Sequence, residues 1–417
     1  MRGKGEGAVY RVPKDRKQPL KYWTAVVELP NPTGDPKDRR RKVVRSKNKS
    51  EVVEKLAKLQ DDLRNRGDLP TSSMTCEKWF LYWVEQVAAK EVRPNTIDGY
   101  RRTIHNHINP AIGRVKLDKL GPAHIRRVHD AILAKGLAST TALLAHRVMS
   151  VSLKDALREN RIGRNPATLV RAPRKSVTEL HALDLTEALQ VLRHVATMPE
   201  GALWATSLLT GARRGEVIGL ERDRVGDSLD LSWQLQRIRW RHGCGGTCDR
   251  IRDRDCPQRK TDDTPADYEY RSLEGGLYWT RPKSPKSWRI IPLIEPLRSI
   301  LLSHLEKSPE NQWGLVFTRK GRPIGPDLAG KDWRKVLVAA GIEKDVRLHD
   351  ARHTAVDLLY LAGVPEDLIQ EIVGHSTRAT TRGYKSPQNQ QRLIAAMEQF
   401  SALLADEPPR EISGRVA

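Results

Sequence analysis

The strongest constraint on the fold is a long stretch, residues 72–172, in which apolar residues recur with helical spacing. Trp79 and Trp83 lie one helical turn apart among polar residues, as on the buried face of an amphipathic helix. Pro94, followed by Asn95 and Thr96, is typical of the first turn of a second helix. We therefore expect residues 72–172 to form a helical domain.

The next segment, "NPAIGRVKL" (109–117), contains residues that end helices. Pro110 and Gly113 predict a break in the second helix there. Helical periodicity then resumes over 123–135 and from about residue 139 to 159.

The N-terminal part, residues 1–70, has a different pattern, since strand-like runs come first and a helix follows. The runs occupy residues 8–10, 22–29 and 42–44. The helix starts near residue 50 and has one apolar face, made by Val52, Leu56, Leu59 and Leu63. This part is predicted to be a small sheet with one helix.

A Pro- and charge-rich stretch, "VRAPRKSV" (170–177), has the composition of an interdomain linker. Beyond it, residues 178–404 mix helices with strands, of which 229–233 and 288–293 are the clearest. The tail, 405–417, has little to bury and is expected to be mobile. The predicted fold class is mainly α with small β-sheets (α+β).

The charge of the chain points to a polyanionic partner. Lys and Arg number 73 and Asp and Glu 51, which gives a net charge of +22, and the sequence pI is about 10.0. Nucleic acid fits such a charge first and a membrane surface second. In residues 1–50 alone, 15 basic residues face 5 acidic ones. This module is therefore either a DNA-binding sheet or a small domain with a solvated basic surface, and the clustered charge favours DNA.

Several protein classes are excluded. No apolar run approaches the ~18 residues of a membrane helix, and the N-terminus has no export segment. Four cysteines do not make a disulfide scaffold. We expect a cytoplasmic protein that joins the nucleoid when it binds DNA. The candidate DNA contacts are Arg39, Arg40, Arg41, Arg101, Arg102 and His105.

Four separated motifs in the third part carry residue types suited to one chemistry. They hold Arg213 ("TGARRGE"), Lys283 ("RPKSPKSWRIIPL"), His349 with Arg352 ("RLHDARH"), and His375 with Tyr384 ("GHSTRATTRGY"). Arginines bind phosphate oxygens in bidentate fashion, a lysine can protonate a leaving alkoxide, and a tyrosine can attack phosphorus. No acidic cluster suggests catalytic magnesium and no P-loop suggests nucleotide hydrolysis. The set fits phosphoryl transfer without a metal.

In order and spacing these motifs resemble the tyrosine recombinases, the phage integrase family. The resemblance implies that Arg213 and Arg352 hold a scissile DNA phosphate, that Lys283 is the general acid, and that His349 and His375 donate to the phosphate or handle protons. Tyr384 would be the nucleophile. No catalytic cofactor is implied.

Other parts resemble the same family. "NTIDGYRRTIHNHINPAIGRVKL" is similar to its core-binding domain, and the basic N-terminal part to its arm-binding domain. The resemblance implies a site-specific integrase of a phage or integrative element, acting as a tetramer on attachment sites in double-stranded DNA, through a 3′-phosphotyrosine and a Holliday junction. It leaves open whether a host DNA-bending protein and an excision factor take part. The alternatives are a type IB topoisomerase-like enzyme and a non-catalytic DNA-binding regulator.

An insertion at about 240–278 departs from the family pattern. It contains four potential ligands of a structural zinc ion, which are His242, Cys244, Cys248 and Cys256. A polar loop whose cysteines bind no metal would have the same sequence pattern, so both interpretations remain open. The amphipathic helix after Tyr384 also has two interpretations, since it can dock on its own domain or on a neighbouring protomer.

Overall fold

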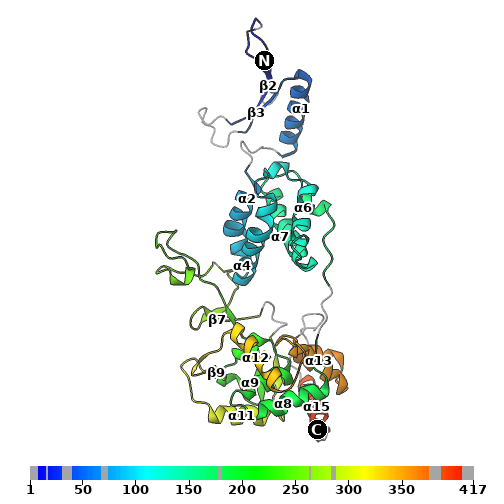
Figure 1. Ribbon diagram of the computed structural model, residues 1–417, viewed down its shortest axis with the longest axis vertical. Coiled ribbons are helices and arrows are strands. Elements are labelled where there is room, and N and C mark those ends of the chain that lie inside the picture. The colour runs from blue at the N-terminus through cyan, green and yellow to red at the C-terminus, as the bar shows by residue number, and fades with distance from the viewer. Residues whose placement is uncertain are drawn as a thin grey trace, which may run out of the picture. The chain divides into compact units, whose positions relative to one another are not determined.

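The computed structural model describes residues 8–15, 17–30, 40–66, 74–176, 181–262, 264–282, 288–374 and 387–405. The chain divides into two compact units, Met1–Val177 and Thr178–Ala417 (Figure 1). Among the described residues, no helix has the length and apolar character needed to cross a membrane.

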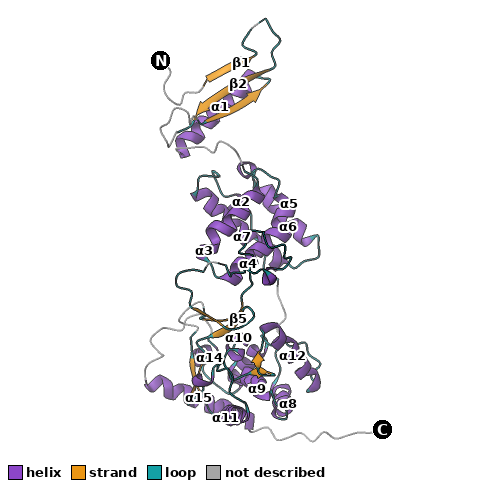
Figure 2. Ribbon diagram, turned by 90° about the vertical axis from the view of Figure 1, so that its left-hand side faces the viewer, coloured by secondary structure: helices purple, strands orange, loops and turns teal. Residues whose placement is uncertain are grey.

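In the first unit, an antiparallel sheet is covered by one helix (Figure 2). The elements are β1 (Ala8–Val12), β2 (Tyr22–Glu28), β3 (Arg41–Ser46) and α1 (Lys49–Arg66), with the strands in the order β1-β2-β3. Ala25 and Val27 of β2 pack against Val52 and Leu56 of α1, which are the apolar positions that the sequence singles out. These elements lie where the sequence predicts them.

The rest of the first unit is a helical bundle. Its elements are α2 (Cys76–Tyr82), η1 (Trp83–Ala88), α3 (Ala89–Glu91), α4 (Pro94–Thr103), η2 (Ile104–Ile108), α5 (Asn109–Ile112), η3 (Leu117–Lys119), α6 (Pro122–Leu133), α7 (Ser139–Arg158) and η4 (Pro166–Leu169). Trp79 and Trp83 are buried, and their indole N–H groups donate to Ser152 and Asp155 of α7 at 2.9 and 2.8 Å. The two tryptophans thus join α2 and η1 to α7.

The predicted break at Pro110 is wrong, although Gly113 does end the helix. Helical backbone continues through Pro110 to Ile112. The reason is that Ile104–Ile108 form a π-helical turn, after which Pro110 falls in the first turn of α5. A proline is tolerated there because it needs no N–H partner.

The second unit packs helices around α9 (Gly201–Thr210), every residue of which is buried. The other helices are α8 (Leu185–Ala196), α10 (Arg214–Ile218), η5 (Arg222–Arg224), η6 (Asp253–Asp255), α11 (Leu297–Lys307), α12 (Pro326–Ala339), α13 (Ala351–Leu361), α14 (Glu366–Val373) and α15 (Pro387–Ala405). Helices α8, α11 and α13 all contact α9. The fold is mainly helical with small sheets, as predicted.

Among the described residues of this unit there are also three small antiparallel sheets, in the orders β4-β8, β5-β7-β6 and β10-β9. Their strands are β4 (Ser228–Asp230), β5 (Gln234–Arg237), β6 (Tyr270–Ser272), β7 (Leu277–Thr280), β8 (Ile290–Pro292), β9 (Thr318–Arg319) and β10 (Arg322–Pro323). The predicted strand 229–233 is confirmed only at its start, because β4 ends at Asp230 and the next strand, β5, begins at Gln234 in a different sheet. The chain changes sheets between Asp230 and Gln234.

Helix α15 packs on its own unit. Leu393, Met397 and Phe400 are buried in the same core as α9, and α15 contacts β8 and α14. In the single chain, α15 therefore docks on its own domain, which is the first of the two interpretations given above.

Candidate active site

The turn between α9 and α10 presents Arg213. Gly211 ends α9 with a φ of 56°, in the left-handed region that favours glycine. A Cβ at Gly211 would lie 3.0 Å from side-chain atoms of both Ala355 and Val373. Only glycine fits this close approach, and two residues later Arg213 begins α10 as its N-cap.

Arg213 is held on both sides while part of it stays exposed. Its Nη1 donates to Oε1 of Glu216 at 2.7 Å, and its backbone N–H donates to Oε2 at 2.8 Å. Its Nη2 donates to the carbonyl oxygen of Gly374 at 2.9 Å. The Arg213 side chain remains 31% exposed, whereas that of Glu216 is fully buried. The guanidinium is therefore fixed in place but accessible to a ligand.

Arg352, from α13, lies at the same turn. Its Nη1 donates to the carbonyl oxygen of Gly211 at 2.9 Å, and its Nη2 has no hydrogen-bond partner among the described residues. Burial, with the charges of Arg289 and Arg213, lowers the pKa of Arg352 to about 9, so the group remains a cation at neutral pH. Two arginines from motifs far apart in sequence thus meet at one turn.

His349 and Asp350 occupy the start of α13. Asp350 is buried and accepts from Nε and Nη2 of Arg347 at 2.7 and 3.0 Å, which fixes the segment before the helix. The ring of His349 is exposed, with its centroid 6.2 Å from that of His353. Partial desolvation, the charge of Arg352 and the nearby His353 lower the pKa of His349, so the neutral imidazole predominates at pH 7.

Three proposed catalytic residues, Lys283, His375 and Tyr384, lie outside the described residues, as does Arg39. The chain on either side of Lys283 is described. The Arg281 guanidinium lies 4.3 Å from the ring centroid of Trp233 and 4.5 Å from that of Trp288. One cation–π stack therefore joins the segments that enter and leave 283–287.

Sequence reasoning missed Arg289, which is 1% exposed and lies 2.8 Å from Oε2 of Glu216 through its Nη2. Its signal was the alternation in "WRIIPL", where Arg289 and Ile291 are buried and Ile290 between them is exposed. A buried arginine that contacts Glu216, in the motif of Arg213, belongs to the same polar cluster.

The other candidate DNA contacts are engaged in varying degrees. Arg101 forms a bidentate ion pair with Glu85, with N–O distances of 2.7 and 2.6 Å, and its side chain is 15% exposed. Of the remaining described candidates, Arg41, Arg102 and His105 are exposed, whereas Arg40 is partly buried. Arg102 pairs with Asp98 at 3.3 Å but stays 60% exposed.

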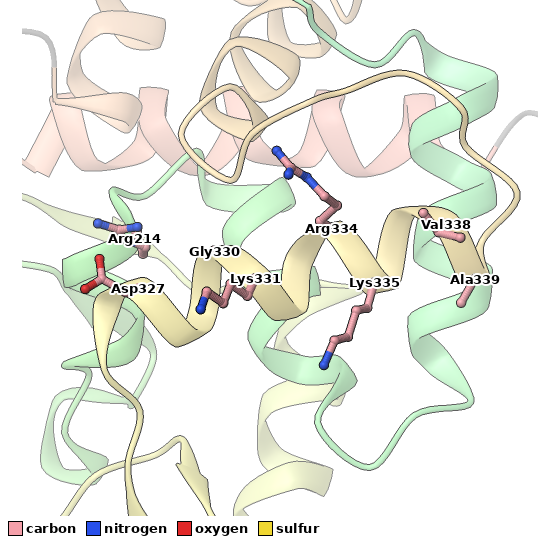
Figure 3. Close-up of a pocket in the computed structure, with 8 residues that line it drawn as sticks. All are labelled: Arg214, Asp327, Gly330, Lys331, Arg334, Lys335, Val338 and Ala339. Atoms are coloured by element: carbon pink, nitrogen blue, oxygen red, sulfur yellow. The ribbon is translucent and has the colours of Figure 1, made fainter.

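A groove of about 1010 Å³ runs along α12 and reaches Arg214, the neighbour of Arg213 (Figure 3). Lys331 and Lys335 lie one helical turn apart and project to the same side of the helix. Its lining also includes Arg334, so this groove carries four basic residues against one acidic residue, Asp327.

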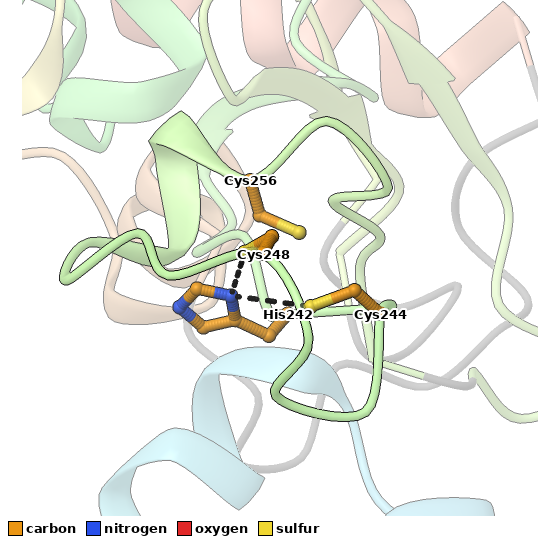
Figure 4. Close-up of side chains that lie close together, drawn as sticks. All are labelled: His242, Cys244, Cys248 and Cys256. Atoms are coloured by element: carbon orange, nitrogen blue, oxygen red, sulfur yellow. Dashed lines mark hydrogen bonds between the residues drawn. The ribbon is translucent and has the colours of Figure 1, made fainter.

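The structure brings the four expected ligands of the insertion together (Figure 4). Their ligand atoms all lie within 4.8 Å of one another. The Nδ1 of His242 is 3.3 Å from Sγ of Cys248 and 3.8 Å from Sγ of Cys244. Tetrahedral zinc would separate such nitrogen and sulfur ligands by about 3.6 Å. Hydrogen bonding, first from Cys248, lowers the pKa of the Cys244 thiol to about 5.

Two family models match the chain. That of the phage integrase family matches residues 267–391, and that of the phage integrase N-terminal SAM-like domain matches residues 75–133. An integrase of Saccharopolyspora erythraea is 29% identical over 400 residues, covering 87% of this chain and 90% of the relative. An integrase of Streptomyces ambofaciens is 25% identical over 401 residues, covering 91% and 92%.

Solved structures share the fold. The Tn1549 transposon integrase in complex with a circular intermediate DNA has a TM-score of 0.58 at 18% identity, covering 78% of this chain and 99% of that one. A lambda integrase tetramer bound to a Holliday junction has a TM-score of 0.54 at 13% identity, covering 87% and 98%. Each of these two solved chains is covered over nearly its whole length.

Proposed function

The chain belongs to the phage integrase family, the tyrosine recombinases, and from that premise we propose that it is a site-specific integrase of a phage or an integrative element. The enzyme catalyses DNA strand exchange. The observation that carries the proposal is the meeting of Arg213 and Arg352 beside Gly374, the residue that precedes His375. This arrangement suits a phosphodiester placed between two guanidinium groups.

In the proposed reaction, the phenol of Tyr384 gives its proton to one of the site histidines, its oxygen attacks phosphorus, and the bond to the 5′-oxygen breaks. Lys283 gives its proton to that oxygen, which leaves a 3′-phosphotyrosine and a free 5′-hydroxyl. Arg213 and Arg352 stabilise the charge that develops on the phosphate oxygens. His349 and His375 donate to the phosphate or carry protons.

The reverse reaction joins the new strands. A 5′-hydroxyl from the partner duplex attacks the phosphotyrosine and releases Tyr384. Because the phosphoester bond is exchanged rather than hydrolysed, the reaction needs neither ATP nor a catalytic cofactor. Two rounds of exchange on synapsed sites pass through a Holliday junction.

The proposed DNA surface includes more than the catalytic turn. Lys331, Lys335 and Arg214 along the α12 groove offer phosphate contacts next to Arg213. Residues 72–172 would act as the core-binding domain and residues 1–70 as the arm-binding module. Since phosphate contacts release counterions, binding should weaken steeply with salt.

The proposed working form is a homotetramer on two attachment sites, by analogy with the lambda integrase tetramer. To dock on a neighbouring protomer in such a tetramer, helix α15 would have to leave the core of its own unit. A host DNA-bending protein and an excision factor are proposed as further partners. The site of action would be the cytoplasm, at the nucleoid.

Trapping on nicked suicide DNA tests the proposed function. The nick lies just beyond the cleavage point, so that the 5′-hydroxyl fragment diffuses away and the covalent complex persists. With the element's own junction sequence and a chelator present, we expect a protein–DNA adduct attached through a 3′-phosphate. DNA binding without an adduct would favour the regulator, and relaxation of supercoiled DNA without recombination would favour the topoisomerase.

We also propose that the His/Cys group of the insertion holds a structural zinc ion. One nitrogen and three sulfur ligands complete a tetrahedron, which leaves no open position for catalysis. Asp253 lies 3.4 Å from the Nε2 of His242, the nitrogen that faces away from the thiols. A carboxylate in that position orients a ligating histidine.

Removal of zinc should unfold the loop that carries the four ligands, residues 242–256. We expect about one zinc ion per chain, and after chelation at least a tenfold faster tryptic cleavage at Arg250, Arg252 and Arg254, since an unliganded loop of this kind has little core of its own. Cys248→Ser should reproduce the effect. Cys76→Ala is the matched control, because this cysteine is buried in the helical bundle and should leave the zinc content unchanged. Purified protein without zinc, and with unchanged proteolysis after chelation, would refute the site.

A further inference from the structure

Arg289 is a fully buried cation that the proposed reaction does not use. Its side chain is 0% exposed, and its Nη2 lies 2.8 Å from Oε2 of Glu216. Its Nε and Nη1 have no hydrogen-bond partner among the described residues. A buried arginine costs free energy unless the surrounding groups use its charge, so its role requires an explanation.

Glu216 connects Arg289 to the catalytic arginine. One oxygen of this buried carboxylate accepts from Nη1 of Arg213, and the other lies against Arg289. Burial alone would raise the pKa of Glu216, but the charges of Arg289 and Arg213 outweigh it and hold the pKa below its ordinary value. Glu216 is therefore an anion shared between two cations.

The backbone at Gly374 packs onto the same arginine. A Cβ at Gly374 would lie 2.9 Å from Nη1 of Arg289, and the φ of Gly374 is 72°. The carbonyl oxygen of Gly374 accepts from Nη2 of Arg213. Arg289 thus supports the Glu216 side and the Gly374 side of Arg213 at once.

The charges explain why such support is needed. Arg213, Arg289 and Arg352 with Glu216 make a cluster of three cations and one anion. Without Arg289, the charge of Glu216 would fall wholly on Arg213 and cancel the field that a phosphate needs. A buried carboxylate that has lost one partner also draws its remaining partner more strongly.

We propose that Arg289 is a positioning residue for strand cleavage, which neutralises Glu216 and so leaves the exposed part of Arg213 free to bind the scissile phosphate. Arg289 follows Lys283 by six residues and directly precedes β8. It therefore also ties the lysine motif to the arginine motif. This inference rests on the recombinase function proposed above.

Single-turnover cleavage of the suicide DNA tests the inference with four variants. Arg289→Met should lower the cleavage rate by about 100-fold, the loss typical of one electrostatic group, with DNA affinity unchanged. Arg289→Lys should retain more activity, since it keeps the charge. Glu216→Gln added to Arg289→Met should restore at least tenfold of the loss, because the unpaired carboxylate is gone. Glu216→Gln alone completes the cycle.

A substrate with an uncharged scissile group distinguishes an electrostatic effect of Arg289 on the phosphate from a folding defect of the variant. A methylphosphonate at the scissile position carries one negative charge less than a phosphate. On this substrate, the ratio of the wild-type cleavage rate to that of Arg289→Met should be at least tenfold smaller than on ordinary DNA. An equal gap on both substrates, with no recovery in the double variant, would overturn the inference. If Arg289→Met does not fold, the double variant decides, and its failure to cleave while folded and bound to DNA would overturn it. Absence of an adduct in wild type would instead refute the proposed function.

Discussion

Tyr384→Phe should remove covalent DNA adducts below detection while leaving DNA binding intact. The substitution deletes only the phenolic oxygen, and no other group is expected to attack the phosphate when the nucleophile is missing. Cleavage, Holliday-junction formation and recombination should therefore disappear together. The measurement is adduct yield on suicide DNA at protein concentrations that saturate binding.

Tyr360→Phe is the matched control for this variant. Tyr360 is a 50% exposed tyrosine on α13, outside the motif that carries Tyr384, and its hydroxyl has no role in the proposed chemistry. It should leave adduct formation at the wild-type level. Recombination by Tyr384→Phe would disprove the assignment of the nucleophile.

Arg352→Ala should lower the cleavage rate by about 10²–10³-fold, as for the loss of one preorganised donor to an oxyanion. The loss has two sources. The phosphate loses one guanidinium, and the carbonyl oxygen of Gly211 loses its donor at the turn that presents Arg213. The cleavage rate of Arg352→Lys should lie between those of wild type and Arg352→Ala, because lysine keeps the positive charge but lacks the planar guanidinium group.

Arg298→Ala controls for the general loss of a positive charge. Arg298 forms an exposed ion pair with Asp227 on the surface of the same unit, and such pairs contribute little to stability. Its cleavage rate should stay within about threefold of wild type. A wild-type rate in Arg352→Ala, measured as single-turnover cleavage, would remove this arginine from the phosphate site.

Local patterns predicted much of the fold. The β1–β3 sheet, α1 and the long helices follow from residue periodicity, which is a property of neighbouring residues. The end of the predicted strand 229–233 at Asp230 was not predictable in this way. It depends on β8 and β7, which pair with β4 and β5 from distant parts of the sequence.

The site shows the same distinction. Motif order identified Arg213 and Arg352, and the structure brings both to the turn at Gly211. The role of Arg289 depends on a contact with Glu216, which is 73 residues away in the sequence. The local sequence therefore does not distinguish Arg289 from a basic residue on the surface. Likewise, nothing near Arg101 in the sequence indicates that Glu85 binds it in a bidentate pair.

Mapping the protein–DNA bond by mass spectrometry tests the central claim most directly. After nuclease trimming of the adduct, a lysine-specific protease releases residues 345–385, a peptide that contains both Tyr384 and Tyr360. Fragmentation should place the nucleotide on the phenolic oxygen of Tyr384, through a 3′-phosphate. A nucleotide on Tyr360, on a serine or on any other residue would contradict the proposed mechanism.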